Sequence, residues 1–245
     1  RGLKRDTELM ILVGFLMFVL ITIAGRQGAL TILTVIFNVA VFATGFWKAG
    51  DTSNVLEMCS RLVILFAVIT LVGLNGIHKK TWAALFTTLI VLVMIMGIFD
   101  VVIHHAEDLD YSTMEYLGSI ENPDEIFHAE ILISGLGAIM DVAVAIAASL
   151  SEIVEKKSEV TFLELFKSGR EIGYDIMGTM INVLLFVFGC GLIPMCLIRM
   201  NNDVSLITII KLHIPCELCR FLVESIGIVL AIPISIDDEG PRNVS

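Results

Sequence analysis

Asp141 is an ionisable residue in the middle of an otherwise apolar segment, which runs from Ile131 to Leu150. A charged side chain at the centre of a membrane helix costs about 2.5 to 3.5 kcal/mol on insertion scales, so such residues are usually paired, neutral or part of an ion or proton path. Asp141 is therefore either a site that takes up a proton or a small cation, or a structural residue that forms hydrogen bonds across helices.

The helical spacing of this segment gives Asp141 small neighbours on its own face of the helix. Those neighbours are Ser134, Ala138, Ala145, Ala148, Ser149 and Glu152, and the opposite face carries Ile139, Val142, Ile146, Leu150 and Ile153. Small residues let helix backbones approach closely inside a membrane bundle. We therefore expect the face of Asp141 to point into the bundle and the opposite face to point toward lipid or apolar neighbours. The candidate packing residues on this helix are Gly137, Ala138 and Ala145.

Two later apolar segments carry polar residues that could join Asp141. One face of the first presents Asp175, Thr179, Asn182 and Gly189, and one face of the second presents Glu217, Arg220, Glu224, Gly227 and Ala231. We take Asp175, Asn182 and Glu224 as candidates to share a proton or cation site with Asp141. Gly189 and Gly227 are candidate positions for helix packing.

Arg220 follows Glu217 by three residues and precedes Glu224 by four, which are spacings at which side chains on one helix meet. We expect an ion pair between Glu217 and Arg220 near a membrane interface. The sequence assigns no role to three isolated polar residues in other apolar segments, Asn38, Asn75 and Asp100.

Common catalytic signatures are missing from the sequence. It contains no G-x-S-x-G elbow, no H-E-x-x-H helix and no G-x-x-x-x-G-K-[ST] phosphate loop. The Cys216-x-x-Cys219 pair, with His213 nearby, lacks the second ligand pair of a structural zinc site. We expect no enzymatic activity, no bound metal, no cofactor and no nucleic-acid partner.

Composition predicts the elements that must position these residues. Of the 245 residues, 56% are hydrophobic and only 17% are charged, and the mean hydropathy is +0.89. Soluble domains carry about 25% charged residues, whereas a membrane helix needs about 20 consecutive apolar residues. We predict a single all-α domain, a bundle of about seven transmembrane helices near residues 9–24, 29–46, 55–76, 81–103, 127–154, 175–199 and 206–236.

The charged residues are segregated into loops, and this predicts the orientation of the helices. Acidic residues gather in the loop 104–126, and no Lys or Arg occurs from Thr81 through Glu155. Basic residues gather in the segment 155–173, which is either an amphipathic surface helix or an extension of its neighbours. Because cytoplasmic loops carry the positive excess, we place the acidic loop and the N-terminus outside and the C-terminus in the cytoplasm. Residues 25–28 predict a tight hairpin between the first two helices.

Three runs of the sequence carry a resemblance to a known family. They are the runs from Ser134 to Glu152, from Gly169 to Asn182 and from Glu217 to Ile234. With them, essentially the whole chain resembles the YibE/F family of bacterial membrane proteins. The resemblance implies a multipass protein of the bacterial cytoplasmic membrane, and it supplies no biochemical activity. Longer members of the family carry an extracellular domain ahead of the first helix, which would fit a processed chain that begins at Arg1.

The fifth and sixth helices, with the charged segment between them, are also similar in pattern to the membrane halves of the SecD/SecF proteins and the wider resistance-nodulation-division transporters. In those proteins a transmembrane Asp takes part in proton coupling. Two functions are therefore open. One is a transporter or ion-coupled permease in which Asp141 takes up a proton or small cation. The other is a non-transporting scaffold or envelope-assembly module, which associates with a second copy or another membrane protein and in which Asp141 is structural.

Overall fold

The computed structural model describes residues 2–49, 55–105, 123–156, 161–212 and 214–243. Every secondary-structure element in these ranges is an α-helix, and six helical segments are long and apolar enough to span a membrane. The predicted all-α transmembrane bundle is confirmed, and the protein is a multipass membrane protein. The helices are α1 (Gly2–Ala49), α2 (Val55–Asn75), α3 (Lys79–His105), α4 (Pro123–Lys156), α5 (Phe162–Asn201), α6 (Leu206–Leu212) and α7 (Ile214–Asn243).

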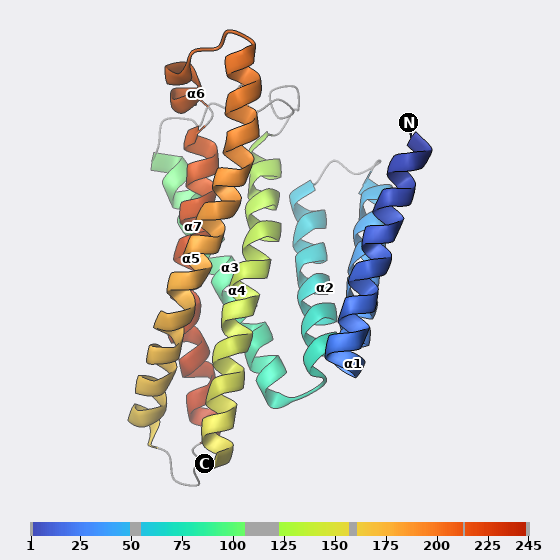
Figure 1. Ribbon diagram of the computed structural model, residues 1–245. Helices are drawn as coiled ribbons and strands as arrows, with labels where there is room; N and C mark the ends of the chain where they lie inside the picture. The colour runs from blue at the N-terminus through green and yellow to red at the C-terminus, as the bar shows by residue number, and fades with distance from the viewer. Residues whose placement is uncertain (1, 50–54, 106–122, 157–160, 213, 244–245) are drawn as a thin grey trace.

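Helix α1 consists of two arms that meet at Gly25, where φ is 53° and ψ is −120°. Glycine adopts this left-handed region without the steric penalty of a Cβ. Three residues later, a Cβ on Gly28 would collide with the carbonyl oxygen of Leu20 in the other arm. The two arms lie side by side in Figure 1, so the described residues hold seven segments that are candidates to cross a membrane when the arms are counted separately.

The second arm of α1 packs antiparallel against α2. The side-chain amide of Gln27 donates a 3.0 Å hydrogen bond to the carbonyl of Leu74, and that of Asn38 donates a 2.9 Å bond to the hydroxyl of Thr70. The first arm lies at the outer edge of the molecule, where its large apolar side chains are exposed (Figure 1). A helix that is apolar all round and exposed is suited to contact with lipid.

The core lies between α2, α3, α4 and α7, and large apolar side chains fill it. Phe99 of α3 and Phe127 of α4 are fully buried with ring centroids 5.4 Å apart. Figure 1 shows α5 running beside α7, and the start of α1 and the end of α7 lie at opposite ends of the bundle. Successive long helices run in opposite directions in Figure 1.

The face of α4 that points into the bundle is the one we expected to face lipid or apolar neighbours. Ile139 has 0% of its surface exposed, and Val142 and Ile146 are equally buried, whereas Asp141 and Gly137 are exposed. The prediction that the face of Asp141 points inward was wrong within this chain. The physical reason is that large aliphatic side chains gain more dispersion contacts than small ones when they are packed between helices.

Helix α5 starts at Phe162, so most of the predicted charged segment 155–173 is a helical extension of a membrane span; residues 157–160 lie outside the described ranges. Glu164 accepts a 3.4 Å hydrogen bond from the backbone of Thr161 at the start of the helix. Gly169 and Gly173 then bring this extension against α7. A Cβ on Gly169 would lie 2.8 Å from a side-chain carbon of Ile236, so the side chain of Ile236 in α7 packs directly against the backbone of α5 here.

The predicted helix over 206–236 corresponds to α6 and α7, and residue 213 between them lies outside the described ranges. One candidate membrane span covers Leu206–Asp237. Of the predicted acidic loop, residues 106–122 lie outside the described ranges, and α3 and α4 extend to its two edges.

Candidate ion site in the membrane bundle

A close approach of α7 to α3 and α4 positions the candidate site. A Cβ on Gly227 would lie 2.8 Å from a methyl group of Ile139 and 3.2 Å from a side-chain carbon of Ile95. Glycine is needed at this crossing because any side chain would push α7 away from its two neighbours. Glu224 lies one turn earlier on α7 and is thereby held against α4.

Glu224 is a buried carboxyl group, with 6% of its surface exposed. Its partner is Ser134 of α4, whose hydroxyl donates a hydrogen bond to it. The same hydroxyl oxygen lies 2.7 Å from the carbonyl oxygen of Glu130. A hydroxyl has one proton to donate and two lone pairs to accept with, so Ser134 can donate to only one of these oxygens at a time.

Arg220 joins two carboxyl groups near Glu224. Its guanidinium forms an ion pair with Glu217, which is the pair that the spacing in the sequence predicts, and its other terminal nitrogen lies 3.7 Å from the carboxylate of Glu130. Glu130, Glu217, Arg220 and Glu224 are hereafter the acidic cluster. The cluster holds three carboxyl groups and one guanidinium, so with every group ionised it lacks two positive charges, and a proton or a small cation could supply positive charge there.

Asp141 lies on the same face of α4 as Ser134, about 10 Å further along the helix axis at 1.5 Å per residue. It is exposed on the outside of the bundle and makes no hydrogen bond or ion pair with any described residue. The structure therefore separates Asp141 from the acidic cluster, although the two lie along one continuous face.

Asp175 and Asn182 lie on the exposed surface of α5. The amide of Asn182 donates a 2.7 Å hydrogen bond to the carbonyl of Gly178 in its own helix. No hydrogen bond or ion pair among the described residues joins Asp175 or Asn182 to Asp141 or Glu224. Of the predicted proton or cation site, only Glu224 has polar partners from another helix.

Sequence reasoning missed Glu130 and gave Ser134 no role of its own. Glu130 precedes Ser134 by four residues, so a helix places both on the face that also carries Asp141. That spacing was the available signal. Glu130 already lies inside the predicted helix 127–154, and α4 begins at Pro123.

The candidate packing residues divide into two groups. Gly227 lies at a close helix crossing, and Ala138 and Ala145 are half-buried. A Cβ on Gly137 or Gly189 would meet no atom within 4 Å, so these two glycines do not mediate packing within the described part of the chain. The prediction was wrong for Gly137 because its face of α4 points outward, and for Gly189 because it lies on the exposed face of α5.

Gly169 and Gly173 pack closely and were not predicted. Their four-residue spacing is the small-x-x-x-small pattern of membrane helix pairs, and it is the signal that could have found them.

A second polar contact lies at the same end of the bundle. His128 of α4 has its Nε2 2.8 Å from the carboxylate of Asp100 in α3 and its Nδ1 2.7 Å from the carbonyl of Asp124. Asp100, to which the sequence assigned no role, thus links α3 to α4. Within the described residues no three His, Cys, Asp or Glu side chains gather as metal ligands, and His213, beside Cys216 and Cys219, lies outside those residues.

Comparison with known proteins matches the chain to one family. The family model of YibE/F-like proteins covers residues 12–236. No curated protein and no solved structure matches the chain.

Proposed function

We propose, from the premise that this chain belongs to the YibE/F-like protein family, that it is an ion-coupled transporter in which Glu224 takes up and releases a proton. Family membership accounts for the membrane bundle, and the proposal for transport rests on the residues of this chain. We further propose that the protein resides in the bacterial cytoplasmic membrane with its N-terminus outside, and that it has no enzymatic activity and no cofactor.

The observation that supports this proposal is the position of Ser134 between two oxygens. When Glu224 is ionised, the hydroxyl of Ser134 donates its proton to the carboxylate. When Glu224 is protonated, its own O–H can donate to the oxygen of Ser134, which then donates to the carbonyl of Glu130 at 2.7 Å. Both states keep every proton in a hydrogen bond, so neither state leaves a buried polar group without a partner.

Asp141 is the second ionisable position in the proposal. The face of α4 carries Glu130, Ser134 and Asp141 in order along the helix, so polar groups occur at successive depths of the span. Intramembrane ionisable residues arranged in this way are typical of proton relays. Asp175 and Asn182 are not part of the proposed relay, because no polar contact connects them to it.

Proton flux into proteoliposomes tests the proposal. A potassium gradient with valinomycin drives protons inward, and an enclosed pH-sensitive dye reports them. We expect Glu224→Gln to reduce flux to the level of empty liposomes while the protein remains folded, because the amide keeps the size of the side chain and cannot ionise. Ser134→Ala should reduce flux less, since water can replace the hydroxyl.

Glu152→Gln is the matched control, because Glu152 is an exposed carboxylate on the same helix and pairs only with Lys156 four residues away. Its flux should equal that of the unaltered protein. Undiminished flux in Glu224→Gln, or no flux through the unaltered protein above that of empty liposomes, would contradict the proposal.

The outward position of Asp141 favours a second function, that of an assembly module. A carboxyl group in contact with lipid is costly, and next to it Gly137 leaves open space in which another helix could approach. Gly137→Leu should then abolish association with a membrane partner or a second copy and leave the fold intact. Gly97→Leu on α3 is the control, since a Cβ on Gly97 also meets nothing within 4 Å. Equal association in both variants would count against assembly through this face.

A further inference from the structure

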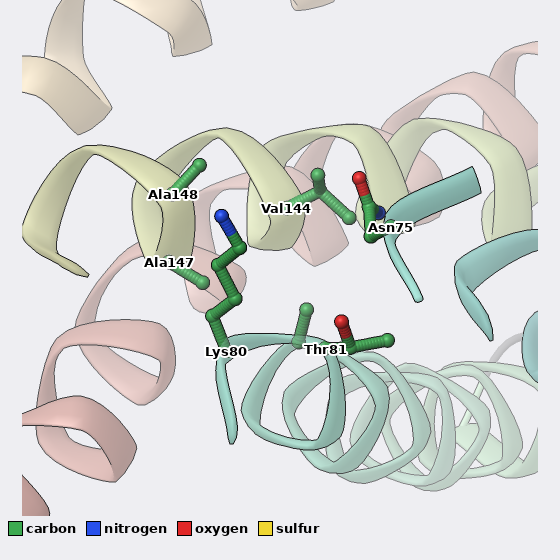
Figure 2. Close-up of a pocket in the computed structure, with 7 residues that line it drawn as sticks. Asn75, Lys80, Thr81, Val144, Ala147 and Ala148 are labelled. Atoms are coloured by element: carbon green, nitrogen blue, oxygen red, sulfur yellow. The ribbon is translucent and has the colours of Figure 1, made fainter. Parts of the chain in front are cut away.

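A small pocket lies at the end of the bundle opposite the acidic cluster, where α2 ends and α3 begins. Its cavity volume is about 30 Å³, more than the roughly 10 to 15 Å³ that one water molecule requires. Three polar residues contribute to its wall on one side, and α4 closes the other side with small apolar side chains. The residues labelled in Figure 2 are Asn75, Lys80, Thr81, Val144, Ala147 and Ala148, and Ala84 also lines the pocket.

Thr81 is the first indication that the pocket has a polar occupant. Only 3% of its surface is exposed, and its hydroxyl oxygen is buried without a hydrogen-bond partner among the described residues. Thr88, two turns later, donates a 2.7 Å bond to the carbonyl of Ala84 in its own helix. Thr81 lies in the first turn of α3, where the residue four positions earlier precedes the helix, so this internal partner is missing. Buried hydroxyl groups are nearly always hydrogen-bonded, which points to a partner in the pocket.

Lys80 and Asn75 supply the other donors. Figure 2 shows the Lys80 side chain reaching from α3 toward α4, and the Thr81 hydroxyl points to the same side of α3. Neither Lys80 nor Asn75 makes a side-chain hydrogen bond or ion pair with a described residue, and no acidic residue lines the pocket. An ammonium group, an amide and a hydroxyl around one cavity form a donor set for an anion.

The surroundings of the pocket are basic and lie at the end of the membrane spans. Arg26 lies in the turn of α1. The next residue, Gln27, donates a hydrogen bond to the end of α2, and Lys79 is the first residue of α3. Basic pockets between transmembrane helices at this depth bind phosphate head groups of lipids. The start of α3 adds the positive end of a helix dipole.

We propose that Asn75, Lys80 and Thr81 form a binding site for the phosphate group of an anionic ligand. The oxygens of the phosphate enter the cavity, and Lys80 balances its charge. The same chemistry is offered by an anionic phospholipid head group and by free phosphate, and the site is independent of the proposed transport function.

Retention of phosphatidylglycerol by the purified full chain, measured by native mass spectrometry with phosphatidylcholine as reference, tests the site. We expect Lys80→Gln and Thr81→Val each to lower the affinity for phosphatidylglycerol about tenfold relative to the unaltered protein. Lys79→Gln is the matched control for charge, because Lys79 is exposed and does not line the pocket. Thr87→Val is the matched control for a buried hydroxyl without a partner.

Inorganic phosphate, added alone or in competition, distinguishes the two sources. Selective retention of phosphatidylglycerol that only the pocket variants lose supports a lipid ligand. Thermal stabilisation by phosphate alone, lost in the same variants, supports a free anion. The proposal is overturned if neither probe binds, or if Lys79→Gln weakens binding as much as Lys80→Gln. In either of those cases, water in the pocket and general surface charge explain the observations.

Discussion

The two ends of the α3–α4 pair carry opposite chemistry. At one end, the acidic cluster holds three carboxyl groups and the guanidinium of Arg220, and every member has a polar partner on α4 or α7. At the other end, Lys80 and Asn75 line a cavity, and the hydroxyl of Thr81 is buried without a partner among the described residues. The side chains of the first site thus contact one another, whereas those of the second face a cavity. Substitutions at the two ends should therefore change stability in different ways.

The largest effect is expected from Gly227→Leu, which removes the close helix crossing beside the acidic cluster. A side chain here meets Ile139 and Ile95, so we expect a loss of about 1 to 3 kcal/mol of stability or more, together with the separation of Glu224 from Ser134. Thermal unfolding in detergent measures it. Gly137→Leu, in open space on the outer face of α4, should unfold at the temperature of the unaltered protein. A greater loss in Gly137→Leu would restore the sequence-based assignment of faces.

Arg220→Gln should have the next largest effect. It leaves Glu217 and Glu130 without their guanidinium, and charge-assisted hydrogen bonds contribute about 1.5 to 3 kcal/mol each. Adding Glu130→Gln should recover part of the lost stability, because it removes one of the repelling carboxylates. The unfolding midpoints of the single and double variants measure both effects. No recovery in the double variant would mean that Glu130 does not belong to the cluster.

Ser134→Ala should lower stability by about 1 kcal/mol, since it removes a hydrogen-bond donor from the buried carboxyl of Glu224. Ser149→Ala is the matched control on the same helix, because the hydroxyl of Ser149 bonds only to the carbonyl of Ala145. Chemical or thermal unfolding of the two variants should place Ser134→Ala clearly lower. Equal midpoints would show that the bond to Glu224 contributes little.

The smallest effect is expected from Thr81→Val, measured in ligand-free detergent solution. Removing a buried hydroxyl that has no protein partner, while keeping the shape of the side chain, should leave stability within about 0.5 kcal/mol or raise it slightly. Ser134→Ala and Thr81→Val thus remove one hydroxyl from each end of the bundle. The first should lower the stability, whereas the second should leave it unchanged or raise it slightly. A marked loss of stability in ligand-free Thr81→Val would mean that the hydroxyl already has a partner inside the protein.

Contacts within one helix could be predicted from the sequence. The Glu217–Arg220 ion pair follows from a three-residue spacing, because 3.6 residues per turn bring such side chains together whatever surrounds the helix. Long apolar segments predicted the membrane bundle for a similar reason. A chain without a helix or closed barrel cannot satisfy its backbone groups in hydrocarbon.

Contacts between helices could not be predicted from the sequence, as the pairs Asp100–His128 and Asn38–Thr70 illustrate. Each of these four residues stands in a different segment from its partner, and the spacing along one helix carries no information about another. The pocket of Asn75, Lys80 and Thr81 likewise required the position of α4 over the start of α3.

The sequence by itself determined which segments cross the membrane, where the chain turns at Gly25, and which residues share a face of each helix. Only the tertiary structure decided which of those faces points inward. In water, an apolar face must be buried, so amphipathicity reveals the interior of a soluble protein. In lipid, a large aliphatic side chain has a similar solvation free energy on the outside and on the inside of the bundle. Packing between helices therefore decides which face points inward. For this reason Ile139 is in the core and Asp141 is at the surface of the bundle, the reverse of what residue size predicted.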